Sequence, residues 1–220
     1  MKKYIFPNPA LLPKNASFCI GGDLEVDTLI TAYKSGYFPW FMPGDPIIWH
    51  CPQTRAVFLP DEIKLHKSTK PFLKKYDVKF DNDFENLINL CYKSRNKNET
   101  WLSDKMVNAY ISLANLGIAH SVEVYYESEL IGGLYGLIFG RVFCGESMVS
   151  LKKEASKVAL INLGKNLEKC NFLIDAQVIN PHLEFMGAKE ISQKEFLTIY
   201  YKLIDENTNL DFKKFKSFYN

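Results

Sequence analysis

The segment Phe172-Leu173-Ile174-Asp175-Ala176-Gln177-Val178-Ile179-Asn180 decides how the rest of the chain is interpreted. Its apolar, partly β-branched composition is typical of a strand that is buried on both faces of a sheet. Asp175 and Gln177 interrupt the run two positions apart, so we expect their side chains on the same face of the strand. Because burying an unpaired carboxylate is costly, Asp175 is either a structural residue with hydrogen-bond partners or part of a functional site.

The elements predicted around this strand indicate an α+β fold. Residues 120–126, 130–139 and 141–149 form apolar runs between short turns, which predicts an antiparallel meander, and a helix over 152–170 follows it. Further helices are predicted over residues 82–92, 103–117, 181–187 and 193–205. A meander followed by a helix and a strand is the layout of acetyltransferase-like (GNAT-type) enzymes, so we expect a mixed, largely antiparallel sheet flanked by helices.

The first 53 residues differ in character from the rest and predict a small N-terminal α/β domain. After irregular chain, a helix is expected to begin between Asp23 and Asp27 and to end at Gly36. Residues 37–49 then combine five aromatic side chains with three prolines, and this segment either fills a core or forms a recognition surface. We divide the chain into residues 1–53 and a larger, acetyltransferase-like domain over residues 54–220.

Composition and charge narrow the class of protein. The chain has 220 residues, 47% of them hydrophobic, which is enough to bury a substantial core. With a net charge of only +2, contact with nucleic acid requires a local basic patch. The five cysteines have no zinc-binding spacing, and no coiled coil, signal peptide or membrane span is present. We therefore expect a monomeric, cytoplasmic protein with free thiols, no membrane contact and no metal.

One candidate basic patch is a row of lysines. Residues 66–76 are predicted to form a helix with Ser68 at its N-cap. Lys67, Lys70 and Lys74 are spaced so that they share one stripe of that helix. Such a row is either an ordinary solvated face or a surface that tracks the phosphates of a nucleic acid.

Two predicted strands carry polar residues where core residues are expected. Glu146 lies beside Gly145, which can bulge its strand, and Asp175 and Gln177 lie in a later strand of the same sheet. Neighbouring strands would bring these side chains together, and paired carboxylates can hold a proton at neutral pH or position an amine. A structural ion network is the alternative interpretation, although two separate polar intrusions favour a site.

Two other chemistries are disfavoured. Cys144 has no visible base near it, so we interpret it as a core or pocket-wall residue rather than a nucleophile. Enzymes of this layout that bind coenzyme A cradle its pyrophosphate on a glycine-containing turn before the long helix. The corresponding residues 150–156 contain no glycine, which weighs against coenzyme A.

Several motifs together resemble the leucyl/phenylalanyl-tRNA–protein transferase family. Two of them are highly specific: Gly36-Tyr-Phe-Pro-Trp-Phe-Met-Pro-Gly-Asp-Pro46 and Phe143-Cys-Gly-Glu-Ser-Met148. The others match in order and extend the resemblance over about residues 7–191: Gly21-Gly-Asp-Leu24, Trp101, His120-Ser-Val-Glu123, Gly132-Gly-Leu-Tyr-Gly136, Ala155-Ser-Lys157 and Asp175-Ala-Gln-Val178. The chain departs from the family pattern at His50-Cys51-Pro52 and over residues 181–187, and Leu134 and Leu163 replace other apolar side chains.

The resemblance implies an aminoacyltransferase that takes Leu or Phe, and less readily Met, from Leu-tRNA or Phe-tRNA. The acceptor is the N-terminal α-amino group of a protein that begins with Arg or Lys, and the product is directed to proteolysis as an N-degron. The family uses no cofactor and no metal. Two alternatives stay open: another acyltransferase of the same fold, dependent on acetyl-coenzyme A or on aminoacyl-tRNA for cell-wall synthesis, and a non-catalytic tRNA-binding module.

The resemblance also implies roles for particular residues. Asp175 matches the central catalytic acid, with Gln177 beside it and Glu146 as their hydrogen-bonding partner. Trp40 and Trp101 match tryptophans near the aminoacyl-adenosine end. The positions that line the amino-acid side-chain pocket in the family are Leu134, Phe143, Leu160, Leu163 and Ile174. The lysine row becomes a candidate surface for the tRNA acceptor stem, and Asp175 either takes a proton from the amine or only orients it.

Overall fold

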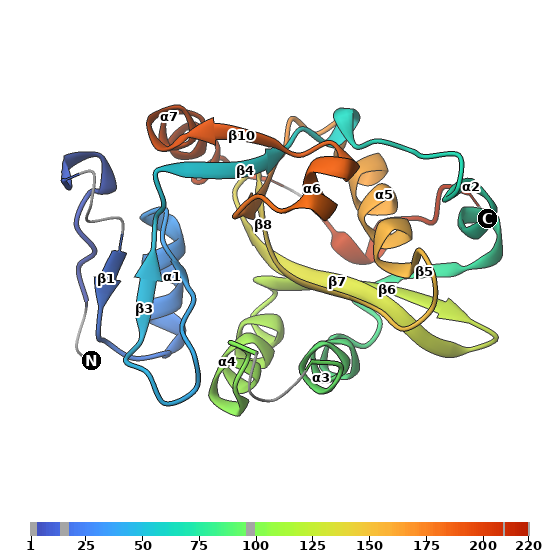
Figure 1. Ribbon diagram of the computed structural model, residues 1–220, viewed down its shortest axis with the longest axis horizontal. Coiled ribbons are helices and arrows are strands. Elements are labelled where there is room, and N and C mark those ends of the chain that lie inside the picture. The colour runs from blue at the N-terminus through green and yellow to red at the C-terminus, as the bar shows by residue number, and fades with distance from the viewer. Residues whose placement is uncertain (1–3, 14–17, 96–99, 209, 220) are drawn as a thin grey trace.

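The computed structural model describes residues 4–13, 18–95, 100–208 and 210–219, and shows an α+β protein built on one large sheet (Figure 1). Its strands run in the order β10-β4-β9-β8-β7-β6-β5, and a smaller sheet has the order β1-β3-β2. The strands are β1 (Phe18–Ile20), β2 (Phe38–Pro39), β3 (Ile48–His50), β4 (Thr54–Phe58), β5 (Asp77–Phe80), β6 (Ala119–Tyr126), β7 (Glu129–Phe139), β8 (Val142–Ser150), β9 (Leu173–Gln177) and β10 (Lys189–Ser192). The α-helices are α1 (Val26–Lys34), α2 (Lys70–Lys75), α3 (Phe84–Lys93), α4 (Asp104–Asn115), α5 (Ala155–Leu167), α6 (Pro181–Met186) and α7 (Gln193–Leu203).

The centre of the large sheet is the antiparallel meander β6-β7-β8, as the sequence predicts. β9 pairs with β8 in parallel, with Asp175 opposite Cys144, because α5 carries the chain back across one face of the sheet. β4 and β10 extend the sheet beyond β9 in antiparallel orientation. The sheet is therefore mixed and largely antiparallel, and β9 lies between β8 and β4.

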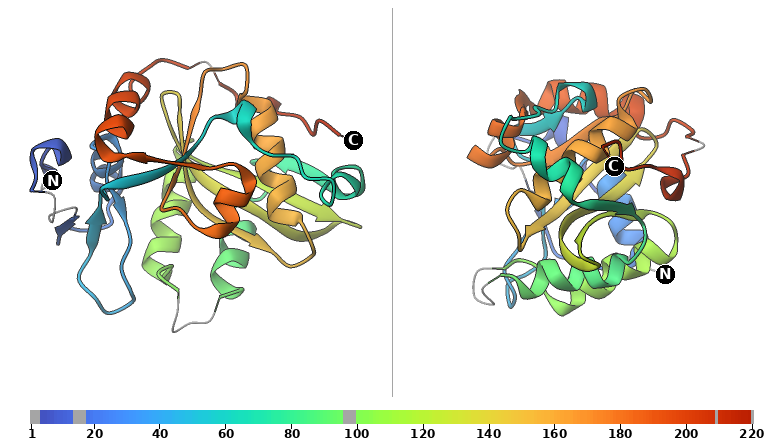
Figure 2. Two further views of the ribbon diagram at one scale, coloured as in Figure 1. Left: turned by 45° about the horizontal axis from the view of Figure 1, so that its top comes forward. Right: turned by 90° about the vertical axis from the view of Figure 1, so that its right-hand side faces the viewer.

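Helices cover both faces of the sheet and divide the core into two parts. α5 and α2 lie on one face, and α3 and α4 lie on the other (Figures 1 and 2). α3 can approach β7 closely because Gly133 has no side chain: a Cβ there would lie 2.8 Å from Cδ1 of Leu87. No helix in the described part of the chain is both long and apolar enough to cross a membrane.

The N-terminal residues form a lobe around α1 and the smaller sheet, at one end of the molecule (Figure 1). Part of the chain before α1 was expected to be irregular, but β1 pairs with β3. The aromatic segment fills part of the core with Tyr37 and Trp49, which are buried, whereas Trp40 is 46% exposed. Tyr33 of α1 belongs to the same core as Tyr110 of α4, so the lobe packs directly on the larger part of the chain.

The predicted lysine helix is shorter than expected. α2 contains only Lys70–Lys75, so Lys67 lies in the turn before the helix and does not share its stripe with Lys70 and Lys74. The physical reason is Pro71, which has no N–H to donate and is accommodated only in the first turn of a helix. The N-cap position is accordingly held by Thr69 rather than by Ser68.

Two further features differ from the prediction for local reasons. The helix predicted over residues 82–92 begins slightly later, because Asp83 is the N-cap of α3 and its side chain accepts the Asn86 N–H at 3.1 Å. The edge strands β5 and β10 were not predicted. Each has only four residues, too few to show a clear periodicity.

Candidate active site

A cavity of about 610 Å³ lies where the N-terminal lobe meets the large sheet. Glu146 and Gln177 line it, whereas Asp175 and the lysine row do not. All seven side chains expected to bind the substrate line it as well: Trp40, Trp101, Leu134, Phe143, Leu160, Leu163 and Ile174. The fold therefore gathers in one place residues that are separated by up to about two thirds of the chain.

One part of the cavity wall is apolar and closely packed. β7, β8 and β9 contribute Leu134, Phe143 and Ile174, and α5 contributes Leu160 and Leu163 from the side that faces the sheet. Each of these five side chains is at most 3% exposed. A wall of this kind selects an apolar side chain by burial and shape rather than by hydrogen bonding.

Flat side chains line another part of the cavity. Trp40 is 46% exposed, and its carbonyl oxygen lies 2.8 Å from Nε2 of His50. Trp101 comes just before α4, and Arg95 donates from Nη2 to Ser147 Oγ at 2.7 Å. Indole and guanidinium planes are suited to stacking on a nucleobase. Arg95 was not among the predicted site residues.

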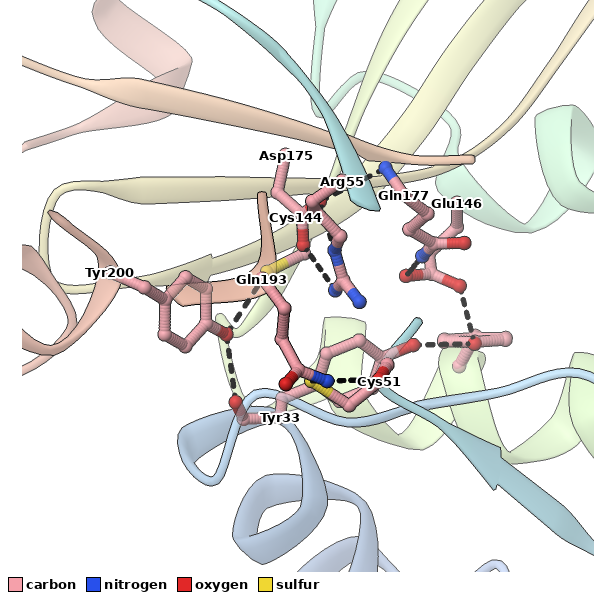
Figure 3. Close-up of polar contacts among 10 residues, drawn as sticks. Tyr33, Cys51, Arg55, Cys144, Glu146, Asp175, Gln177, Gln193 and Tyr200 are labelled. Carbon is pink, nitrogen blue, oxygen red and sulfur yellow. Dashed lines mark hydrogen bonds and ion pairs between the residues drawn. The ribbon is translucent and has the colours of Figure 1, made fainter. Parts of the chain in front are cut away.

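Glu146 is the carboxylate that faces the cavity. Gln177 donates from Nε2 to Glu146 Oε1 at 2.8 Å (Figure 3). The Tyr110 hydroxyl donates to Oε2 at 2.7 Å. The Tyr33 hydroxyl lies 2.9 Å from that of Tyr110, so a chain of buried hydroxyls continues into α1. The predicted contact between Gln177 and Glu146 is present, while both tyrosines were missed because they read as ordinary core residues of amphipathic helices.

Local irregularities in two strands aim these side chains. In β8, Gly145 pairs with Gly136 and Ser147 pairs with Tyr135, so Glu146 is the extra residue of a bulge. The pairing of β9 with β4 shifts in register between Asp175 and Gln177, so Ala176 is the extra residue of a second bulge. Gln177 itself has a φ of 64°. The sequence suggested the Glu146 bulge through its neighbouring glycine, but nothing in it indicated the second irregularity.

The expectation that Asp175 and Gln177 share a face is not met. Asp175 is 0% exposed and lies behind the cavity wall, whereas Ala176 and Gln177 both line the cavity. The bulge and the positive φ of Gln177 replace the regular alternation of a strand. The two residues still touch, because the Gln177 backbone N–H donates to Asp175 Oδ1 at 2.9 Å.

Arg55 of β4 is the partner that the sequence did not reveal. Its Nε donates to Asp175 Oδ1 at 2.8 Å and its Nη2 to Oδ2 at 2.6 Å, a bidentate ion pair (Figure 3). The guanidinium carbon lies 4.5 Å and 4.6 Å from the ring centroids of Phe38 and Phe196. The available signals were a lone arginine at the start of an apolar strand and an unexplained aspartate in another apolar strand.

Burial changes the protonation of this centre. Desolvation raises the pKa of Glu146 from 4.5 to about 7, with the hydroxyl groups of Tyr110 and Tyr33 partly opposing the rise. Desolvation lowers the pKa of Arg55, but the Asp175 carboxylate more than compensates, and the net shift is upward. Glu146 is thus a carboxyl group that exchanges its proton near neutral pH, and Arg55 remains a cation.

The remaining predicted residues are also placed. Cys144 is 0% exposed with its Sγ 3.7 Å from the Tyr200 hydroxyl, and burial raises its thiol pKa well above the usual value, so the interpretation as a core cysteine is confirmed. Lys67, Lys70 and Lys74 are exposed on and beside α2. Among the described residues, no group of three or more His, Cys, Asp or Glu side chains could hold a metal ion.

An apolar cavity lined by a glutamate whose pKa is raised to about 7 is an arrangement typical of enzyme active sites. Comparison with known families identifies it further. The family model for the leucyl/phenylalanyl-tRNA protein transferase matches residues 57–201, and the model for its N-terminal domain matches residues 22–53. The chain therefore belongs to the leucyl/phenylalanyl-tRNA–protein transferase family, and it is a transferase.

The similarity to individual transferases extends over almost the whole chain. A leucyl/phenylalanyl-tRNA–protein transferase of Campylobacter jejuni strain RM1221 is 47% identical over 204 residues, which cover 93% of this chain and 92% of that protein. The corresponding transferase of Aliivibrio fischeri is 46% identical, covering 93% and 87%. That of Vibrio campbellii is 47% identical, covering 93% and 89%.

Proposed function

We propose that the protein transfers Leu or Phe, and less readily Met, from Leu-tRNA or Phe-tRNA to the N-terminal α-amino group of proteins that begin with Arg or Lys. The product would then be an N-degron that is routed to proteolysis. The observation that carries the proposal is the cavity, which joins an apolar side-chain wall to Glu146, Gln177 and two tryptophans. The names of the relatives support the coarser part of the proposal, the transfer of Leu or Phe from tRNA to a protein.

The cavity supports a division of labour among its residues. The five buried apolar side chains would hold the Leu or Phe side chain, and Trp40 and Trp101 would hold the terminal adenosine by stacking. The aminoacyl ester is already activated, so aminolysis mainly requires a neutral amine at the right position and support for the oxyanion. Glu146, Gln177 and Asp175 form the proposed reaction centre, with Asp175 acting from behind the cavity wall.

The exposed lysines would guide the tRNA. Lys70 and Lys74 on α2 and Lys67 beside it form the proposed surface for the acceptor stem. All five cysteines are free, which supports a reducing compartment, and we place the reaction in the cytoplasm with a monomeric enzyme.

One assay tests the proposed function. The protein is incubated with tRNA charged with labelled Phe and with two peptides that differ only in their first residue, Arg or Ala. The labelled Phe is expected on the Arg peptide, joined by an amide bond to its α-amino group, and not on the Ala peptide. If neither peptide carries label while intact Phe-tRNA is still present, the activity is a different one. Label from acetyl-coenzyme A would support the alternative acyltransferase.

A further inference from the structure

The two carboxylates of the reaction centre are held in opposite ways. Asp175 is 0% exposed, does not line the cavity, and has both oxygens bound by Arg55. Glu146 lines the cavity and accepts hydrogen bonds from two neutral donors, Tyr110 and Gln177. Among the described residues, no cation forms an ion pair with Glu146. An α-amino group arrives at neutral pH largely as an ammonium ion, so the substrate supplies the charge that Glu146 lacks.

We propose that Glu146 accepts the proton of the attacking amine, and that Arg55 is the positioning residue that withholds Asp175 from this role. This inference rests on the proposed function and specifies its chemistry. Arg55 fixes Asp175, Asp175 binds the backbone N–H of Gln177, and Gln177 in turn binds Glu146. The ion pair therefore acts through two further residues to aim the carboxylate that meets the substrate.

The proposed step balances in atoms and charge. The ammonium ion gives one proton to the Glu146 carboxylate, and the neutral amine attacks the ester carbonyl carbon to form a C–N bond. The resulting intermediate has a positive nitrogen and a negative oxygen. It collapses with cleavage of the bond to the tRNA ribose oxygen, which takes the second proton of the nitrogen. The protonated Glu146 then releases its proton to solvent.

Other ionisable groups near Glu146 do not account for a titration near neutral pH. Burial raises the pKa values of Tyr33, Tyr110, Tyr135 and Cys144 well above their usual values, and Arg55 remains charged. Asp175 is paired with Arg55, and Arg95 is a guanidinium. His182, which also lines the cavity, has a pKa that burial lowers from 6.5. Glu146, with a pKa of about 7, titrates between the usual pKa values of a histidine side chain and an α-amino group.

The pH dependence of kcat/KM for the acceptor peptide tests the inference, measured with Phe-tRNA from about pH 5.5 to about pH 9. The wild-type profile is expected to be bell-shaped, rising with the Glu146 pKa of about 7 and falling with the α-amino pKa of about 7.7–8.0. Glu146→Gln should lower kcat/KM by about 10²-fold or more and change the shape to a single rise that follows the amine alone. Phe-tRNA binding and a cooperative thermal transition confirm that this variant is folded.

Two further variants keep the test decisive. His182→Gln should leave the rise near pH 7 in place. The double variant Arg55→Gln/Asp175→Asn removes both charges but keeps a donor close to the position of the Arg55 Nε. It should transfer more slowly, with the bell shape retained. A Glu146→Gln profile that stays bell-shaped, or a double variant whose bell shape is lost while Phe-tRNA still binds, would overturn the inference. A wild-type protein that transfers no Phe would instead overturn the proposed function.

Discussion

Arg55 and Asp175 are 120 positions apart in the chain, yet their side chains meet in the core through hydrogen bonds of 2.8 and 2.6 Å. This ion pair joins β4 to β9, and Phe38 and Phe196 contact the guanidinium from the N-terminal lobe and from α7. The pair therefore connects the large sheet with the N-terminal lobe and with α7, directly behind the cavity. Its burial makes it sensitive to the loss of either charge.

Single substitutions in the pair should destabilise the protein more than removal of the pair. Arg55→Gln and Asp175→Asn each leave one buried charge without a partner, and each should lower the free energy of unfolding by about 3–5 kcal/mol. The double variant should lose less than the sum of the two changes. Urea denaturation of the four proteins measures the coupling, and additive losses would show that the two side chains do not interact as described.

Glu146→Gln should stabilise the protein at alkaline pH. The pKa of Glu146 rises from 4.5 to about 7 on folding, so its stabilising contribution is complete below about pH 4.5 and is lost as the pH rises through about 7. At about pH 8 the variant should gain about 2 kcal/mol, less than the full shift implies because Glu146 borders an open cavity. At about pH 5 wild type and variant should unfold at similar urea concentrations. A gain that is independent of pH would contradict the raised pKa.

Tyr110→Phe should move the acid side of the pH profile to higher pH. The Tyr110 hydroxyl donates to Glu146 Oε2 at 2.7 Å and stabilises the ionised carboxylate, so its loss raises the Glu146 pKa further. Transfer at about pH 7 should fall, while transfer at higher pH should be less affected. Tyr33→Phe is the matched control, and its shift should be in the same direction but smaller, because the Tyr33 hydroxyl contacts that of Tyr110 whereas Tyr110 bonds Glu146 directly.

Leu163→Phe should change the choice of amino acid. Leu163 is 0% exposed in the apolar wall, so a larger side chain there reduces the space for the substrate. The kcat/KM for Phe-tRNA should fall about 10-fold or more relative to that for Leu-tRNA, and Leu163→Ala should shift the ratio the other way. Parallel assays with both charged tRNAs measure the ratio. Equal losses with both substrates would place Leu163 outside the side-chain pocket.

Replacing Lys67, Lys70 and Lys74 by Ala should weaken tRNA binding and reduce its dependence on salt. Each lost phosphate contact reduces the slope of log K against log salt concentration by about 0.7–0.9. Replacement of the exposed Lys213, Lys214 and Lys216 by Ala makes the same change in net charge on another segment and serves as the control. Equal effects from both triple variants would indicate general electrostatic attraction rather than a defined surface at α2.

Much of the central sheet could be predicted from the chain alone. The strands that became β6, β7, β8 and β9 and the long helix between them follow from runs of apolar residues and short turns, which are local signals. The short elements were less predictable. β5 and β10 depend on pairing with neighbours in the sheet, and the start of α2 depends on Pro71, so their bounds required tertiary context or attention to one residue.

The site was partly predictable for a related reason. Glu146 and Gln177 drew attention because polar residues interrupt apolar strands, and the resemblance to a family added the tryptophans and the apolar wall, which the structure gathers around one cavity. Arg55 and Tyr110 were missed because each occurs in a segment whose pattern is ordinary for a strand or helix, and Arg95 was missed because it follows α3 in a polar connecting segment. Their importance depends on partners that are distant in sequence.

The sequence by itself determined the α+β class, the order of the main elements and the two carboxylates that need an explanation. Those properties follow from composition and periodicity, which act over short stretches of chain. Only the tertiary structure decided how each carboxylate is held. Strand order brings Arg55 to Asp175, and the bulges of β8 and β9 turn Glu146 and Gln177 into the cavity. The protonation of each carboxyl group and its access to the cavity depend on burial and on neighbouring groups. Both arise only when distant segments of the chain pack together.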